Sequence, residues 1–205
     1  MKLLIATRNR HKLEEIKAIF GLPSLELMSA ADFPDLPDII EDGATFEANA
    51  IKKAVTLSLI AHLWTLADDS GLEVAALSGE PGVRSARYAG EPVDYGANNR
   101  KLLNAMAAKE NRAARFRCAI ALSSPSGRAQ VVEGQCEGTI AHEPHGDNGF
   151  GYDPLFIPKG HSRTFAEMSA DLKNSMSHRG AALRRAGEAW GSILALDPPD
   201  WPGSK

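Results

Sequence analysis

Two adjacent carboxylates are the first candidates for chemistry in this sequence. Asp68 and Asp69 follow the apolar run "LWTLA" and precede Ser70 and a glycine. A pair of carboxylates can bind a divalent cation, and one of them can take a proton from an attacking water molecule. Asp, Ser and Gly are also common turn residues after a strand, and taken alone the pair favours a plain turn. The other polar segments must decide between these two interpretations.

A second acidic segment precedes a predicted helix. Glu41 and Asp42 stand directly before "GATFEANA". Magnesium takes oxygen ligands, commonly one or two carboxylates together with substrate phosphates, so Glu41 and Asp69 could form such a pair if their segments converge. Considered alone, Glu41 and Asp42 indicate a solvated acidic loop. Lys53, on the following helix, could reach a phosphate or could be an ordinary surface lysine.

The segment "ATRNRHK" (6–12) joins a predicted strand to a predicted helix. A helix N-terminus offers unpaired backbone N–H groups and the positive end of the helix dipole, and both favour anions. A hydroxyl, an amide and a lysine here suit a polyphosphate, but a helix start capped by Thr or Asn is an equal alternative. The segment is not a P-loop, because G-x-x-x-x-G-K-[ST] is absent. Its polar side chains are Thr7, Arg8, Asn9, Arg10, His11 and Lys12.

The segment "GFGYDPLF" (149–156) places an aromatic ring between two glycines. Gly149 and Gly151 would let the backbone approach a ligand closely, and Phe150 could stack on a base. Tyr152 could stack too, although a core position suits it equally. Asp153 precedes a proline, so the competing interpretation of the segment is a tight turn into a strand.

Basic residues occupy an unusual place in "KNSMSHRGAAL" (173–183). Ser177 is a plausible helix N-cap, which puts His178 and Arg179 in the first turn, where the helix dipole disfavours positive charge. Their position is easier to explain if they, with Lys173, face a ligand. A simple surface helix start is the alternative.

The elements that must position these residues mix strands and helices. The turn "PSGR" predicts an antiparallel hairpin between its flanking strands. The fold class is therefore α/β, with a mixed central sheet and flanking helices. The predicted strands are 2–6, 25–29, 64–68, 115–124, 129–141 and 155–157, and the predicted helices are 11–20, 46–61, 98–108, 165–174 and 177–194; 31–43 and 78–92 are loops.

Composition narrows the function classes. The 205 residues are 43% hydrophobic and carry a net charge of -3, which suits one globular domain over 1–205 and argues against a nucleic-acid binder. The two cysteines, Cys118 and Cys136, do not form a Cys-x-x-Cys pair and fit a reducing cytosol. We find no signal peptide or membrane-length apolar run, so we expect a soluble cytoplasmic protein. The tail 197–205 is expected to be flexible.

Taken together, the motifs resemble the inosine triphosphate pyrophosphatase family, which includes bacterial dITP/XTP pyrophosphatases. The matching segments follow the family's order over nearly the whole chain. One departure is Arg8, where the family usually has glycine, and this puts the detailed shape of the phosphate loop in question. The segments are "TRNRHK" (7–12), "EDGATFEANA" (41–50), "ADDSGLEV" (67–74), "PGVRSARYAG" (81–90), "GFGYDPLF" (149–156) and "KNSMSHRGAAL" (173–183).

The resemblance implies hydrolysis of ITP, dITP and XTP to the monophosphate and pyrophosphate, with Mg²⁺, in a homodimer of elongated, two-lobed subunits with a cleft between the lobes. Alternatives are a pyrophosphatase for modified pyrimidine nucleotides and a nucleotide-binding regulator without catalysis. The implied catalytic base is Asp69, and the implied magnesium ligands are Glu41 and Asp69, supported by Asp68. The implied substrate-binding residues are Thr7, Arg8, Asn9, Arg10, His11, Lys12, Lys53, Ser70, Phe150, Gly151, Tyr152, Asp153, Lys173, His178 and Arg179.

Overall fold

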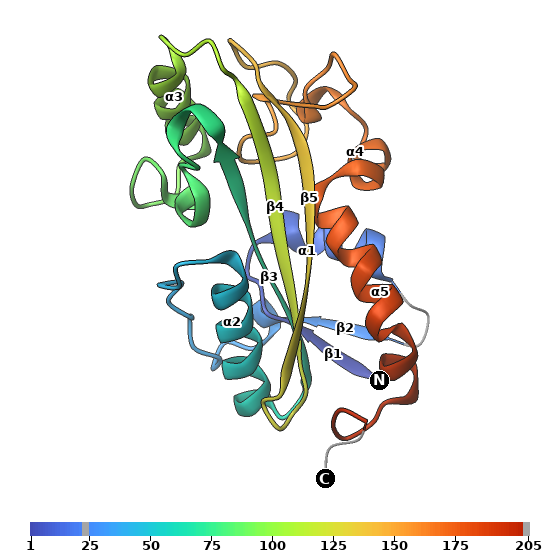
Figure 1. The fold of residues 1–205 in the computed structure, drawn as a ribbon. Coiled ribbons are helices and arrows are strands. Elements are labelled where there is room, and N and C mark those ends of the chain that lie inside the picture. The colour runs from blue at the N-terminus through green and yellow to red at the C-terminus, as the bar shows by residue number, and fades with distance from the viewer. Residues whose placement is uncertain (22–24, 203–205) are drawn as a thin grey trace. The chain divides into compact units, whose positions relative to one another are not determined.

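The computed structural model describes residues 1–21 and 25–202. Strands and helices alternate along the first part of the chain, and two helices close it (Figure 1). Short 3-10 helices occupy Ala30–Asp32, Ala75–Leu77, Gly82–Arg87 and Phe165–Glu167. The main elements are β1 (Lys2–Ile5), α1 (Arg10–Phe20), β2 (Glu26–Ser29), α2 (Phe46–Ala61), β3 (Trp64–Val74), α3 (Tyr95–Met106), β4 (Ala113–Ser123), β5 (Ala129–Ile140), β6 (Phe156–Pro158), α4 (Ala170–Met176) and α5 (His178–Leu196).

Side-chain caps set the starts of the early helices. The Thr45 hydroxyl accepts a hydrogen bond from the Ala48 N–H at 3.1 Å, which confirms the predicted cap of α2. Asp94 accepts from the Ala97 N–H at 2.9 Å in the same way. Because Asp94 provides this cap, α3 begins at Tyr95 rather than at residue 98.

The six strands form a mixed sheet, as the sequence predicts, and their order is β2-β1-β3-β4-β5-β6. Strand β1 pairs in parallel with both β2 and β3, whereas β5 and β6 are antiparallel. Parallel neighbours need a crossover, and α1 and α2 provide the two connections. Strands β4 and β5 form the predicted hairpin, whose turn is closed by a 2.9 Å hydrogen bond from the Ser124 N–H to the Arg128 carbonyl.

Strand β3 is longer than predicted, and this changes the setting of the aspartates. We expected the strand to end at Asp68, with a turn after it. Instead β3 runs through Asp68, Asp69 and Ser70 to Val74. Turn-forming residue types are overridden here because the strand is buried along most of its length and its backbone groups need partners.

The chain forms two compact units, each assembled from separated stretches. Unit 1 contains Met1–Asp69, Cys118–Gly134 and Arg179–Lys205. Unit 2 contains Ser70–Arg117 and Gln135–His178. Three of the boundaries fall within β3, β4 and β5, so each of these strands contributes residues to both units, and the fourth follows His178, the first residue of α5.

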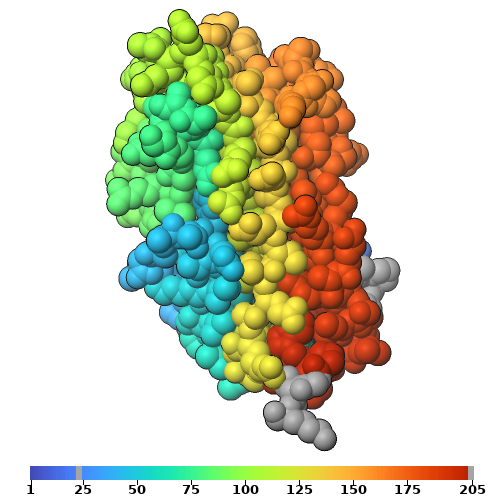
Figure 2. Space-filling view, viewed as in Figure 1, coloured from blue at the N-terminus to red at the C-terminus, as the bar shows by residue number. Residues whose placement is uncertain are grey.

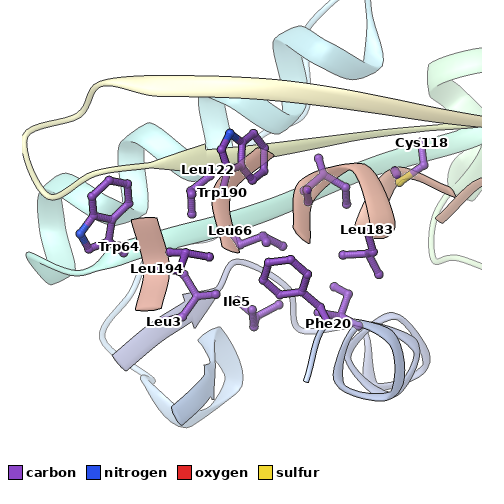
Figure 3. Packing of buried hydrophobic residues seen from close by; sticks show 14 of the residues in the cluster. Leu3, Ile5, Phe20, Trp64, Leu66, Cys118, Leu122, Leu183, Trp190 and Leu194 are labelled. Carbon is purple, nitrogen blue, oxygen red and sulfur yellow. The ribbon is translucent and has the colours of Figure 1, made fainter. Parts of the chain in front are cut away.

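The core of unit 1 packs α1 and α5 against its strands. Figure 3 shows Leu3 and Leu66 from the strands facing Phe20 of α1 and Leu183 and Trp190 of α5. Within this unit, α2 and α5 lie on opposite sides of the strands (Figure 1). The Ser58 and Ser123 hydroxyls, 2.8 Å apart, join α2 to β4.

The turn of the hairpin also belongs to unit 1, and Figure 2 shows it (yellow) beside α2 (cyan). Gly127 in this turn has a φ of 85°, and a Cβ atom there would lie 3.0 Å from Leu59 of α2. Glycine thus meets both the backbone conformation and the close approach at this point.

Unit 2 has its own aromatic core. The rings of Phe116 and Phe156 lie 4.7 Å apart at 60°, and Phe165 lies 5.1 Å from Phe156. Leu72 and Leu102 are fully buried in the same cluster.

The end of the chain differs from the flexible tail we expected. Trp201 is buried in the core of unit 1, 5.0 Å from the Trp64 ring. The Trp64 indole N–H also donates to the Pro198 carbonyl at 2.7 Å. Pro198 and Trp201 therefore have packing partners in unit 1, while 203–205 lie outside the described residues. Among the described helices, we find none that combines the length and the apolar character needed to cross a membrane.

Candidate active site

The two aspartates of β3 point to opposite sides of the strand. Successive side chains of a strand alternate between faces, so Asp68 shares a face with Leu66, on the side of α1 and α5. Asp69 points to the other side, where α2 lies. Both carboxylates are buried, with 1% of Asp68 and 4% of Asp69 exposed. Adjacent residues of the same type therefore enter different environments.

Asp68 lies among fixed positive charges. Its Oδ2 is 3.1 Å from the Lys12 ammonium and accepts hydrogen bonds from Nη2 and Nε of Arg179 at 3.1 and 3.3 Å. Arg179 is itself buried and also pairs with Glu15 of α1. Burial alone would raise the pKa of Asp68, but Lys12 and Arg179 outweigh burial and hold the pKa well below its usual range. Asp68 is therefore ionised at neutral pH.

Asp69 lies in a less positive environment. Its Oδ2 accepts a 2.9 Å hydrogen bond from the amide of Asn49, and its Oδ1 is 4.0 Å from the Lys53 ammonium. Burial raises the pKa of Asp69, and nearby Glu41 adds to this, while Lys53 opposes it. The pKa values of Asp68 and Asp69 thus move in opposite directions, a division typical of carboxylates with different tasks.

The ammonium group of Lys53 lies between the carboxylates of Glu41 and Asp69. Its ammonium is 2.6 Å from Glu41 Oε1, 4.0 Å from Asp69 Oδ1, and donates to the Asp68 backbone carbonyl at 2.6 Å. These oxygens are the ligand type that Mg²⁺ prefers, so the residues fit such an ion. Among residues 1–21 and 25–202, the structure has no cluster of three or more His, Cys, Asp or Glu side chains that could hold a metal. Protein carboxylates here could therefore supply only part of a metal's coordination.

The start of α1 has the capped geometry expected of an anion site. Asn9 Oδ1 accepts from the backbone N–H groups of His11 and Lys12 at 3.0 and 3.3 Å, and Thr7 Oγ1 accepts from the Asn9 N–H at 3.1 Å. The first turn of α1 contains no acidic residue, so no side chain of this turn offsets the positive end of the helix dipole. Cap and anion site are thus compatible interpretations of this segment.

The remaining basic residues of this segment point elsewhere. Arg8 donates to the Leu36 carbonyl at 2.7 Å and pairs with Asp38 at 2.9 Å. Arg10 pairs with Glu14 on the surface of α1. His11 is exposed. The arginine that departs from the family pattern therefore ties the start of α1 to the loop at residues 36–38.

In unit 2, Asp153 organises the glycine-rich loop. It accepts a 2.9 Å hydrogen bond from the Phe150 N–H and pairs with the Lys173 ammonium at 2.6 Å. Gly149 has a φ of 74°, and a Cβ atom there would lie 2.1 Å from Asp153 Oδ2, so only glycine fits. The Lys173 ammonium lies 5.1 Å from the centroid of the Phe150 ring. A positive donor and an aromatic face are therefore presented together.

Three other predicted residues of unit 2 are placed as follows. The Tyr152 hydroxyl donates to the Ser85 carbonyl at 2.9 Å, and Tyr152 is buried in the core. The His178 ring stacks on Phe116, with centroids 4.5 Å apart. Ser70 directly follows Asp69 along β3 and is partly buried.

Four residues beside these sites were not singled out from the sequence. Asn49 contacts Asp69, and Glu15 contacts Arg179. In unit 2, the ring of Tyr95 lies 6.0 Å from that of Phe150, and an amide on the same helix, that of Asn99, donates to the Gly151 carbonyl at 3.0 Å. For Asn49 a signal existed, since it is a polar residue on the buried face of α2, which is mostly apolar.

Comparison with known proteins identifies relatives over nearly the whole chain. The model of the Ham1 family matches residues 3–189. A protein of Syntrophobacter fumaroxidans named dITP/XTP pyrophosphatase is 52% identical over 192 residues, which are 94% of this chain and 83% of that protein. A protein of Geobacter sulfurreducens with the same name is 52% identical over 185 residues, covering 89% of this chain and 92% of its own.

Solved structures show the same fold. The Staphylococcus aureus Ham1 protein superposes with a TM-score of 0.85 at 39% sequence identity. The match covers 94% of this chain and 100% of the Staphylococcus aureus chain.

Proposed function

Since the chain belongs to the Ham1 family, we propose that it hydrolyses purine nucleoside triphosphates other than ATP and GTP, namely ITP, dITP and XTP, to the monophosphate and pyrophosphate. The observation that carries this proposal is the arrangement in unit 1. Asp68 lies 3.1 Å from Lys12 at the capped start of α1, and Glu41 and Asp69 lie 2.6 and 4.0 Å from Lys53. Such an array can hold a polyphosphate and activate water beside it.

The residues of unit 1 divide this task among them. The Thr7–Lys12 segment at the start of α1 would bind the triphosphate, and Lys53 would neutralise charge on the pyrophosphate that leaves. Asp69 is the proposed general base, because its pKa is raised while that of Asp68 is lowered. Asp68 would hold Lys12 in place. Arg179 would orient Asp68 and would not contact the purine base of the nucleotide.

We propose Mg²⁺ as the cofactor, held by Glu41 and Asp69. When bound, Mg²⁺ would neutralise phosphate charge and lower the pKa of a coordinated water molecule. The convergence of both carboxylates on the Lys53 ammonium supports their affinity for a cation. Asp68 contributes through its position beside Asp69, since its own Oδ2 is engaged by Lys12 and Arg179.

The residues of unit 2 would bind the nucleoside. Phe150 offers a ring for stacking, and the Lys173 ammonium beside it can donate to the 6-oxo group of hypoxanthine or xanthine. Adenine has a 6-amino donor at this position, which would leave the buried ammonium facing another donor. Such polar mismatches can discriminate by ~10⁴-fold. His178 and the loop at 150–153 would complete the contacts, with Ser70 at the start of the unit.

We also propose that the protein acts in the cytoplasm as a homodimer. The two cysteines are free thiols, which suits a reducing compartment.

Unit 2 has a hollow of about 820 Å³ on its sheet, lined by residues that include Glu73, Arg115 and Ile157. A second copy could cover this face, and sedimentation velocity of the purified protein should then give the mass of two chains.

The test of the activity is pyrophosphate release from ITP, dITP, XTP, ATP and GTP, each with Mg²⁺ and with EDTA. We expect rapid release from the first three, little from ATP and GTP, and none in EDTA. Equal rates on all five nucleotides would refute the proposed specificity, and binding without release would indicate a regulator instead of an enzyme.

A further inference from the structure

We propose that Asn49 is a positioning residue that orients the carboxylate of Asp69 and fixes its distance from the Glu41 segment. Asn49 lies on α2, is 1% exposed, and contacts both segments through one amide group. The inference rests on the proposed function, because it concerns the group assigned as general base.

The two ends of the Asn49 amide have different partners. Its Nδ2 donates to Asp69 Oδ2 at 2.9 Å, and its Oδ1 accepts from the Gly43 N–H at 2.7 Å. If the amide rotated by 180°, its NH₂ group would face the Gly43 N–H and its oxygen would face the carboxylate. Both new contacts would be repulsive, so these partners hold the amide in a single orientation.

Close packing keeps this link short. Gly43 approaches Asn49 so closely that a Cβ atom on Gly43 would lie 2.6 Å from Asn49 Oδ1 and 3.1 Å from the Ala48 Cβ. Gly43 stands two residues after Glu41, so the same amide connects the Glu41 segment to Asp69. The amide of Asn49 therefore contributes to the spacing of the two carboxylates, in addition to the loop that carries Glu41.

The bond also distinguishes the two oxygens of Asp69. Because Asn49 holds Oδ2, the carboxylate cannot rotate freely, and Oδ1 is directed toward Lys53 at 4.0 Å. Asn49 and Lys53 are four residues apart, so they lie one turn apart on the same face of α2 and approach opposite oxygens of Asp69. A base that must meet one water molecule gains from such a fixed orientation.

The experiment compares Asn49→Ala and Asn49→Asp with Asn98→Ala as the matched control. Asn98 is also 1% exposed, and its amide likewise makes two kinds of contact, but to the backbone of Ala86 and Ala89 in unit 2. The Asn49→Asp variant keeps the shape and the acceptor for Gly43, but replaces the donor to Asp69 by a carboxylate oxygen and adds a buried negative charge beside Asp69. For each variant we would measure kcat on dITP, the Kd of a non-hydrolysable α,β-methylene analogue of dITP, and the urea unfolding curve.

We expect kcat to fall about 100-fold in both Asn49 variants, while the Kd of the analogue for Asn49→Ala stays within about threefold of the wild type. Asn98→Ala should unfold at a similarly reduced urea concentration and keep kcat within about threefold. Retention of kcat in Asn49→Ala, or an equal loss in Asn98→Ala, would overturn the positioning role. If the wild-type chain releases no pyrophosphate, both this inference and the proposed function are refuted.

Discussion

At the scale of the residue, strand geometry separates two neighbouring aspartates. The alternation of β3 directs Asp68 toward Lys12 and Arg179, and Asp69 toward Asn49 and Lys53. Asp68 is thus held ionised by cations, whereas burial raises the pKa of Asp69. The difference makes Asp69 the better proton acceptor and Asp68 the better anchor for positive charge.

We expect Asp69→Asn to lose most turnover while retaining nucleotide binding, because the amide cannot accept a proton. The loss should be about 10²- to 10⁴-fold in kcat, the usual range for a general base. Pyrophosphate release and calorimetric binding of the α,β-methylene analogue measure the two effects separately. Asp42→Asn is the control, since Asp42 is an exposed acid paired with Lys52 at 2.6 Å. Near-normal turnover in Asp69→Asn would remove Asp69 from the proposed role.

Asp68→Asn should destabilise the protein, because it leaves the buried guanidinium of Arg179 with less compensation. The loss should be roughly 3–5 kcal/mol at pH 7, as for other broken buried ion pairs. The pKa of Asp68 is lowered on folding, so its contribution is fully present above about pH 4 and is lost as the pH falls through the folded-state pKa. Urea unfolding of both forms at pH 7 and pH 3 should show the difference shrinking at the lower pH.

At the scale of the element, helix starts and a tight loop present the polar groups. The start of α1 is capped by Asn9 and has no acidic residue in its first turn. Helix α2 exposes one face and buries another that includes both Asn49 and Lys53. The loop at Gly149–Asp153 is folded around the Asp153 carboxylate. Each element therefore uses its polar groups twice, once for its own structure and once for the proposed site.

Asn9 caps α1 and also lies in the proposed triphosphate site, and substitutions can separate these two roles. Asn9→Asp should keep the cap, because aspartate caps helices as well as asparagine does, and should change stability by less than about 0.5 kcal/mol. It should raise KM for dITP about tenfold, because a negative charge is added where the triphosphate is proposed to bind. Asn9→Ala should instead cost about 1 kcal/mol of stability. An unchanged KM in Asn9→Asp would argue against triphosphate binding at this end of α1.

The glycine-rich loop offers a matched pair of substitutions. Gly149→Ala and Gly151→Ala both place alanine at a positive φ, of 74° and 64°; Gly151→Ala should lose about 1 kcal/mol of stability, and Gly149→Ala more, because its Cβ would also lie 2.1 Å from Asp153 Oδ2. Only at Gly149 would the new Cβ meet Asp153, whereas the Cβ at Gly151 has nothing within 4 Å. We expect Gly149→Ala to raise KM for dITP more than Gly151→Ala does. Equal effects would show that Asp153 does not organise the nucleoside contacts.

At the scale of the whole molecule, residues from both ends of the chain pack in the core of unit 1. Unit 1 draws on three stretches of sequence, and its core combines Leu3 near the beginning with Trp201 near the end. The Trp201 indole N–H donates to the Arg128 carbonyl at 2.7 Å, so the tail is also tied to the hairpin turn. The tail is therefore part of the core of the unit that carries the proposed catalytic residues.

Deletion of residues 198–205 should lower the melting temperature by about 10 °C. Loss of a buried tryptophan costs about 3 kcal/mol, and for a chain of this size each kcal/mol shifts Tm by roughly 2–4 °C. Differential scanning calorimetry measures the change. A control that lacks only residues 203–205 retains Trp201 and should melt near the wild type. Equal melting of both deletions would show that Trp201 adds nothing to the core.

The sequence by itself determined the fold class, most of the helices and strands, and the segments whose residues could take part in binding or catalysis. Strand alternation and the cap at Thr45 act over a few residues, so they can be recognised without neighbours in space. The family motifs likewise identified Glu41, Asp68 and Asp69. Local rules failed at the end of β3 and at Trp201, because burial by distant segments overrode the local turn and tail signals.

Only the tertiary structure decided the partners of these residues. Asn49 reaches Asp69 across 20 residues, Arg179 reaches Asp68 across 111, and Arg179 also pairs with Glu15. A periodic pattern shows which face a side chain occupies but not which distant side chain meets it there. The unequal pKa values of Asp68 and Asp69 follow from those partners, because burial and neighbouring charge act through space and not along the chain.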